Sequence, residues 1–164
     1  TSPSMDIQIS SNFERLLFEA YGRDAAAVRR LMESLKQSGS FTIEAKPLAE
    51  IRALFGAGRS DIADTAKTIK SVLASDGYLA DPHTAVGIKV ARDIQPSATP
   101  MIVLSTAHPA KFPDAVKAAC GVEPALPAHL ADLMSRQEKF TVLPNSLEMV
   151  QRHVEKLARA GKAE

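Results

Sequence analysis

Residues 99–106 read Thr-Pro-Met-Ile-Val-Leu-Ser-Thr, and this stretch decides the predicted fold. Its apolar centre, Met101 to Leu104, is bounded by a proline and by hydroxyl residues, which is typical of a strand buried in a sheet. No other segment of the chain carries so strong a strand pattern. The stretches before and after it have helical patterns, and strands that alternate with helices indicate an α/β protein with a mainly parallel sheet.

Two weaker segments extend the predicted sheet. Residues 41–45, FTIEA, alternate apolar and polar side chains, and residues 140–144, FTVLP, form a candidate edge strand that ends at Pro144. So few strands make a thin sheet for a chain of 164 residues. We therefore expect an α/β fold in which helices pack on a short, mainly parallel sheet. Because the chain also begins without an initiator methionine, we expect the rest of the sheet to lie in upstream sequence.

The other patterns predict helices, because apolar side chains recur at helical spacing and the segment ends carry capping residues. Asp24 precedes one such segment and Gly39 follows it, while Asp81 and Pro82 occupy the cap and the first-turn position of another. The predicted helices begin near Asn12, at Asp24 and near Ile62, and cover residues 47–55, 81–94, 109–121, 127–137 and 146–160.

The composition excludes several classes of protein. Twenty basic and nineteen acidic residues give a net charge of +1, and neither sign forms a long block, so we expect no binding to nucleic acid. No apolar run approaches the roughly 20 residues that span a bilayer, so we expect no membrane segment. The single cysteine, Cys120, cannot form a disulfide within the chain, and the N-terminus lacks a signal-peptide pattern. We therefore expect a cytoplasmic protein whose partners are small molecules or other proteins.

The residues that follow the predicted strand are the first candidates for chemistry. In open α/β sheets, ligands bind beyond the carboxyl ends of the strands, and Ser105 and Thr106 stand at such an end. A hydroxyl there can hold a heterocyclic nitrogen in its neutral form, or it can cap the next helix, and the pattern alone favours the cap. His108 has no ligand-type spacing with the other histidines, so a metal site is disfavoured. Lys111 is a solvated charge or a contact to a phosphate group.

Two further segments raise the question of anion binding. In residues 81–87, DPHTAVG, the free amides of a predicted helix start near Thr84 can face a ligand, or the helix is simply capped and packed through Ala85. Gly56-Ala57-Gly58 lacks the Lys-Ser/Thr that follows in a phosphate-binding P-loop. We therefore do not expect this glycine pair to bind phosphate.

Three segments, taken in order, resemble one known family. Residues 2–15, SPSMDIQISSNFER, residues 81–87, DPHTAVG, and residues 104–113, LSTAHPAKFP, are similar to the C-terminal part of the long threonine synthases of bacteria and fungi. The resemblance implies a pyridoxal 5'-phosphate enzyme with the fold of tryptophan synthase β subunits, of which residues 1–164 are an incomplete, C-terminal portion of the catalytic domain. It also implies conversion of O-phospho-L-homoserine and water to L-threonine and phosphate.

The resemblance assigns cofactor contacts to this chain. It implies that Thr106 lies beside the pyridine nitrogen of the cofactor, with Ser105 next to it. A neutral hydroxyl at that nitrogen leaves the ring less electron-withdrawing than a carboxylate does. Thr84 and Ala85 are implied on the other side of the cofactor.

The resemblance also implies that His108 and Lys111 are supporting contacts or contacts to the substrate phosphate, and that no catalytic residue lies in this chain. The family's Schiff-base lysine and the loop that binds the cofactor phosphate belong to upstream sequence, so the missing N-terminal part is the expected partner and the chain alone is expected to be inactive. Two alternatives stay open. The parent protein can be a related dehydratase or β-replacement enzyme, or this chain can be a non-catalytic α/β binding module.

Overall fold

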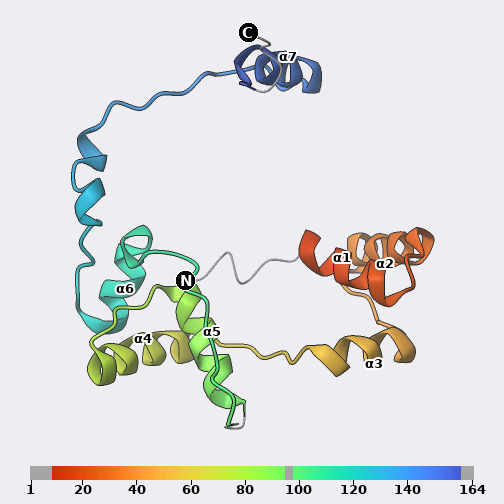
Figure 1. Cartoon of the computed structure of the whole chain (residues 1–164), viewed down its shortest axis with the longest axis horizontal. Coiled ribbons are helices and arrows are strands. Elements are labelled where there is room, and N and C mark those ends of the chain that lie inside the picture. The colour runs from red at the N-terminus through yellow and green to blue at the C-terminus, as the bar shows by residue number, and fades with distance from the viewer. Residues whose placement is uncertain (1–8, 95–97, 160–164) are drawn as a thin grey trace. The chain divides into compact units, whose positions relative to one another are not determined.

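The computed structural model describes residues 9–94 and 98–159. Contacts divide the chain into one unit that ends at Ala125 and a second that begins at Leu126. The elements, shown in Figure 1, are α1 Ser11–Ala20, α2 Ala25–Ser38, α3 Ala45–Leu54, α4 Ile62–Asp76, α5 Pro82–Asp93, the 3₁₀ turn η1 Pro109–Lys111, α6 Pro113–Cys120, the 3₁₀ turns η2 Ala128–Leu130 and η3 Leu133–Ser135, and α7 Leu147–Leu157.

The prediction of helices packed on a short parallel sheet is wrong for this structure. Residues 9–94 and 98–159 contain no strand, and the predicted strands at 41–45, 99–106 and 140–144 form no ladder, with Ala45 opening α3 instead. A strand is stable only when a neighbouring strand pairs with its backbone groups. Ile102 and Leu104 are accordingly 81% and 74% exposed, although their apolar character had predicted burial.

The helix predictions that rested on capping residues are confirmed. The Asp24 carboxylate accepts from the backbone N–H groups of Ala26 and Ala27 at the start of α2, and Gly39 ends that helix with a φ of 75°. A carboxylate at this position satisfies free amides of the first turn, and glycine adopts the left-handed conformation of the last residue without strain. α1 begins as predicted near Asn12, and the Ser10 hydroxyl caps it.

The helix predicted over residues 127–137 is largely absent and is replaced by the two short turns η2 and η3. Most helical stability in proteins comes from packing of an apolar face. Within this segment Leu133 and Met134 are 42% and 83% exposed, so no such packing supports a continuous helix. The helix predicted over 109–121 is also divided, since Pro113 restricts the residue before it and α6 begins only there.

The core that positions the candidate site lies between α4, α5 and α6. α4 packs against both other helices, and Ile69, Ala80 and Ala85 are fully buried there. α1 packs separately against α2 and α3, with Leu17 buried. Helix faces of this kind are stabilised chiefly by the removal of apolar surface from water.

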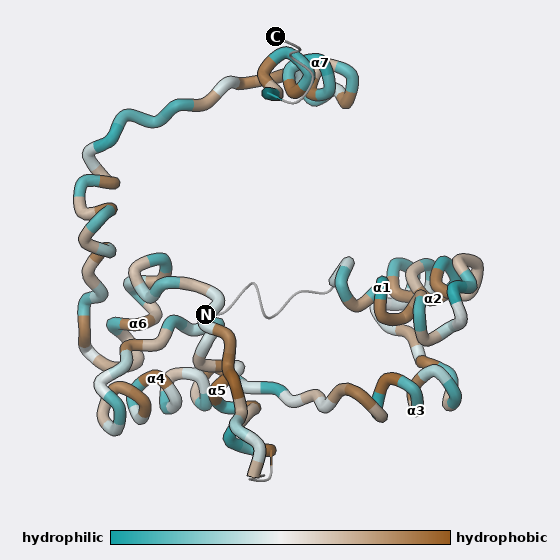
Figure 2. The backbone as a smooth tube through the Cα atoms, in the orientation of Figure 1, coloured by the Kyte–Doolittle hydropathy of each residue, from teal (hydrophilic) through white to brown (hydrophobic). Residues whose placement is uncertain are grey.

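An apolar extended segment, residues 101–104, runs beside α5, as Figure 2 shows by its hydropathy. At Gly87, an added Cβ would lie 3.2 Å from Val103 Cγ1. The absence of a side chain at Gly87 therefore lets the segment lie close to the helix. In the second unit, α7 leaves Leu147, Val154 and Leu157 exposed. In the part of the chain that the structure describes, no helix has the length and apolar character to cross a membrane.

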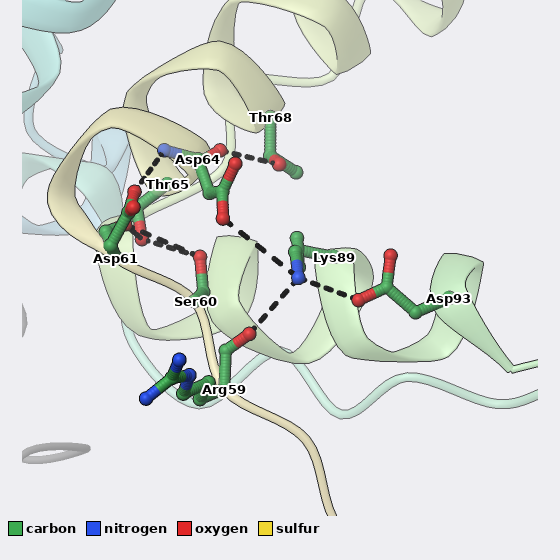
Figure 3. Close-up of polar contacts among 8 residues, drawn as sticks. All are labelled: Arg59, Ser60, Asp61, Asp64, Thr65, Thr68, Lys89 and Asp93. Atoms are coloured by element: carbon green, nitrogen blue, oxygen red, sulfur yellow. Dashed lines mark hydrogen bonds and ion pairs between the residues drawn. The ribbon is translucent and has the colours of Figure 1, made fainter.

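Lys89 ties the start of α4 to α5, as Figure 3 shows. Its ammonium donates to the Arg59 carbonyl oxygen at 3.1 Å and lies 2.6 Å from Asp93 Oδ2 and 3.8 Å from Asp64 Oδ2. The hydrogen bond with Asp93, followed by the charges of the nearby aspartates, raises the pKa of Lys89 above the ordinary value of lysine. Because the amine stays protonated at neutral pH, these contacts hold the loop before α4 against α5.

The glycine pair in that loop has a packing role at Gly58. A Cβ added to Gly58 would lie 2.8 Å from Val90 Cγ1 on α5, whereas one added to Gly56 would meet open space. Valine has few rotamers in a helix, so it cannot easily move aside. We expect Gly58→Ala to lower the free energy of unfolding by about 1–3 kcal/mol, measured by urea denaturation. The matched control, Gly56→Ala, is expected to change it by less than about 0.5 kcal/mol, and equal losses would contradict the packing role.

Candidate functional site

The candidate site begins with a buried aspartate at the start of α5. Asp81 is 0% exposed, and its Oδ1 accepts from the backbone N–H groups of His83 at 2.8 Å and Thr84 at 3.2 Å. The sequence favours this arrangement, because aspartate at the cap and proline at the first helical position both stabilise a helix start. The carboxylate has a second oxygen, which is therefore available to a side chain.

That second oxygen binds the Thr84 hydroxyl. Thr84 Oγ1 donates to Asp81 Oδ2 and accepts a hydrogen bond of 3.2 Å from the backbone N–H of Thr106. Thr84 is itself buried, whereas Thr106 is exposed. The structure thus brings together Thr84 and Thr106, two residues that the sequence had singled out separately.

Ser105, the neighbour of Thr106, is held by a different residue. The Tyr78 hydroxyl and the Ser105 hydroxyl lie 3.0 Å apart in a hydrogen bond. A pocket on this side is lined by residues that include Tyr78, Ser105, His108 and Pro124. Ser105 and His108 therefore share one concave surface.

His108 and Lys111 flank the short turn η1. His108 Nδ1 accepts from the backbone N–H of Ala110 at 3.2 Å, so this ring nitrogen caps the turn. Lys111 ends the turn and is exposed. The ring of Phe112, the next residue, packs edge-on against the His83 ring with centroids 4.5 Å apart, which joins η1 to the start of α5.

Ala85 lies apart from the exposed residues of the site. It is fully buried in the core with Ile69 and Ala80, so its methyl group contributes to packing. A groove between α5 and the extended segment is lined instead by residues that include His83, Gly87, Val103 and Thr106. Among residues 9–94 and 98–159, no group of three or more potential ligand side chains could hold a metal ion. The expectation that this chain holds no metal site stays a prediction.

Sequence reasoning missed two residues of this arrangement. The sequence indicates Asp81 as a helix cap but does not reveal its bond to the Thr84 side chain, and no sequence pattern singles out Tyr78. The only local signal for this bond is an aspartate followed directly by proline, with threonine as the third residue after the aspartate. The contact of Tyr78 spans 27 residues, and no local pattern reveals such a distance.

Comparison with known sequences gives consistent similarities. A family model described as threonine synthase, C-terminal, matches residues 84–154. The chain is 50% identical over 163 residues to the threonine synthase of Pseudomonas aeruginosa, covering 98% of this chain and 35% of that protein. It is 35% identical over 180 residues to the threonine synthase of Saccharomyces cerevisiae, covering 94% of this chain and again 35% of the relative. The chain therefore spans about a third of the length of these relatives.

Solved structures give the same relationship. The chain superposes with a TM-score of 0.78 and 68% identity on the crystal structure of threonine synthase from Brucella melitensis with PLP bound, covering 97% of this chain and 34% of that one. It superposes with a TM-score of 0.70 and 31% identity on threonine synthase from yeast, covering 94% of this chain and 35% of that one. Residues 2–8, the start of the first matching motif, lie outside the described residues.

Proposed function

We propose, from the premise that this chain belongs to the threonine synthase family and matches its C-terminal part, that residues 1–164 form the C-terminal portion of the catalytic domain of a pyridoxal-phosphate-dependent threonine synthase. The parent protein then converts O-phospho-L-homoserine and water to L-threonine and phosphate. The observation that carries the proposal is the 50% identity over 98% of the chain. The same chain contains Thr84 and Thr106, which are joined by a hydrogen bond.

The residues around Thr106 fit a cofactor that needs a neutral partner for its ring nitrogen. Thr106 is exposed, and its backbone amide, not its hydroxyl, makes the bond to Thr84. The nearby carboxylate of Asp81 is buried and already bonded to helix amides and to Thr84. The site therefore presents a hydroxyl, and not a carboxylate, on this surface. When bound, pyridoxal phosphate supplies an electron sink for carbanion chemistry at the substrate.

The chain's own residues have distinct roles in this proposal. Thr106 holds the ring nitrogen through its hydroxyl, and Ser105 is fixed beside it by Tyr78. His108 and Lys111 contact the substrate phosphate, a role that suits an exposed cation and an imidazole at the end of a short turn. Thr84 and Ala85 support the cofactor side without lining it, Thr84 through the hydrogen bond it accepts from the Thr106 backbone and Ala85 through its packing in the core.

The rest of the same protein is the proposed partner of this chain. It would supply the Schiff-base lysine and the loop for the cofactor phosphate, and it would cover the exposed apolar residues Ile102 and Leu104. On this proposal the chain alone is inactive. We also propose a cytoplasmic location, which fits a single, half-buried cysteine, Cys120, and small-molecule chemistry.

An assay of the full-length protein tests the proposed function. With pyridoxal phosphate and O-phospho-L-homoserine, we expect L-threonine and phosphate to be released in equal amounts. Turnover of serine or threonine in place of phosphohomoserine would favour a dehydratase, and the absence of any turnover would favour a non-catalytic module. Borohydride reduction is the companion test. We expect the cofactor to label a lysine beyond residues 1–164, and stoichiometric labelling of Lys111 would overturn the assignment of this residue.

A further inference from the structure

We infer that Asp81 is a positioning residue for Thr106, and that it acts through the Thr84 hydroxyl. The inference rests on the proposed function, because that function is the reason why the position of Thr106 matters. The contacts themselves belong to this chain. The Asp81 carboxylate binds Thr84, and Thr84 binds the backbone of Thr106.

The direction of the hydrogen bonds follows from the groups involved. A hydroxyl has one proton to donate, and a backbone N–H can only donate. Since Thr106 N–H donates to Thr84 Oγ1, the Thr84 proton is free to go to Asp81 Oδ2, an acceptor at hydrogen-bonding distance. With its proton committed to Asp81, the Thr84 hydroxyl has none left to donate to a ligand. Thr84 therefore positions Thr106 and does not donate a hydrogen bond to the cofactor.

Burial makes this arrangement effective. Asp81 is 0% exposed and Thr84 is 3% exposed, so water does not compete for their hydrogen bonds. Hydrogen bonds are electrostatically stronger in such surroundings than in water, and unmade ones are costly. Thr106, by contrast, is exposed. A buried, hydrogen-bonded pair thus fixes the backbone nitrogen of Thr106, whose hydroxyl is open to a ligand.

A second contact restrains the same dipeptide from the other side. The Tyr78 hydroxyl bonds Ser105, but Tyr78 is 43% exposed, so water can replace this contact. Loss of the buried contact from Thr84 is therefore expected to matter more than loss of the exposed one. The comparison of Thr84→Val with Tyr78→Phe tests this order.

The experiment uses the full-length protein and separates structure from activity. In Thr84→Val, which keeps the shape of threonine but has no hydroxyl, we expect hydrogen–deuterium exchange at the Thr106 amide to accelerate roughly tenfold. Exchange is read by mass spectrometry with residue resolution. The absorption spectrum of the bound cofactor is expected to shift, and kcat is expected to fall more than KM rises. Thr84→Ser, which keeps the hydroxyl, should restore all three, and Tyr78→Phe should change the exchange less than Thr84→Val.

Asp81→Asn tests the carboxylate itself. Its amide oxygen can still cap α5, but its amide nitrogen donates to Thr84 instead of accepting, so the Thr84 proton loses its acceptor. We expect the same spectral shift as in Thr84→Val with thermal unfolding that remains cooperative. Unchanged exchange at Thr106 in Thr84→Val would overturn the inference. A wild-type protein that binds no pyridoxal phosphate would instead overturn the proposed function, while the exchange measurement would still decide whether Thr84 holds Thr106.

Discussion

Replacing Ile69 with alanine is expected to lower the free energy of unfolding by about 2–5 kcal/mol, the range for removal of a buried aliphatic side chain that leaves a cavity. Ile69 is 0% exposed and packs against Ala80 and Ala85, where α4 meets its neighbours. The same helix provides a matched control, because Ile62 is 69% exposed. The residue type and the substitution are identical, so the difference between the two variants reports burial.

Urea denaturation followed by circular dichroism measures both variants. We expect Ile62→Ala to change the free energy of unfolding by less than about 0.5 kcal/mol, as surface substitutions usually do. Similar losses in the two variants would show that Ile69 is not part of a cooperative core. A change in the slope of the transition, and not only in its midpoint, would mean that the unfolded state had changed as well.

Replacing Thr106 with valine is expected to lower kcat/KM of the full-length protein for O-phospho-L-homoserine by roughly five- to a hundredfold, which corresponds to about 1–3 kcal/mol for a polar group left without its partner. The substitution keeps the backbone N–H that binds Thr84, so the local fold is expected to persist. Steady-state kinetics with saturating pyridoxal phosphate, together with the affinity for the cofactor, measure the effect.

Thr106→Ser is the matched variant, because it retains a hydroxyl at the same position. It is expected to keep most of the activity. Thr42→Val removes a hydroxyl from another exposed position and is expected to leave the kinetics unchanged. If Thr106→Val were as active as the wild-type protein, the hydroxyl would not hold the cofactor and the proposed role of Thr106 would be lost.

The helices with capping residues at their ends were predictable, because those ends are determined by local chemistry. Asp24, Asp61 and Asp81 cap the helices that follow them, and Gly39 and Gly77 end helices in the left-handed conformation. Each of these signals acts within a few residues. The sheet was not predictable in this way, because an apolar run shows that a segment prefers burial but cannot show whether a pairing strand is present.

For the candidate site, too, local signals were predictable and long-range contacts were not. Ser105 and Thr106 could be singled out, because hydroxyl residues follow an apolar run. Thr84 was singled out as well, but the contacts that hold Ser105 and Thr106 were not predictable, since the bond from Thr84 spans 22 residues and the bond from Tyr78 spans 27. Such contacts depend on how α5 and the extended segment pack. No alternation or spacing in the sequence encodes that packing directly.

The unpaired segment beside α5 also bears on how this chain behaves in solution. Met101, Ile102 and Leu104 present apolar side chains, and the backbone between them has no ladder partner among the described residues. An exposed backbone without ladder partners, flanked by apolar side chains, is a template for pairing with other chains. Expressed without the rest of its protein, the chain carries an aggregation hazard at residues 101–104. Solubility on co-expression with the upstream part is therefore a direct indicator of whether that part covers the segment.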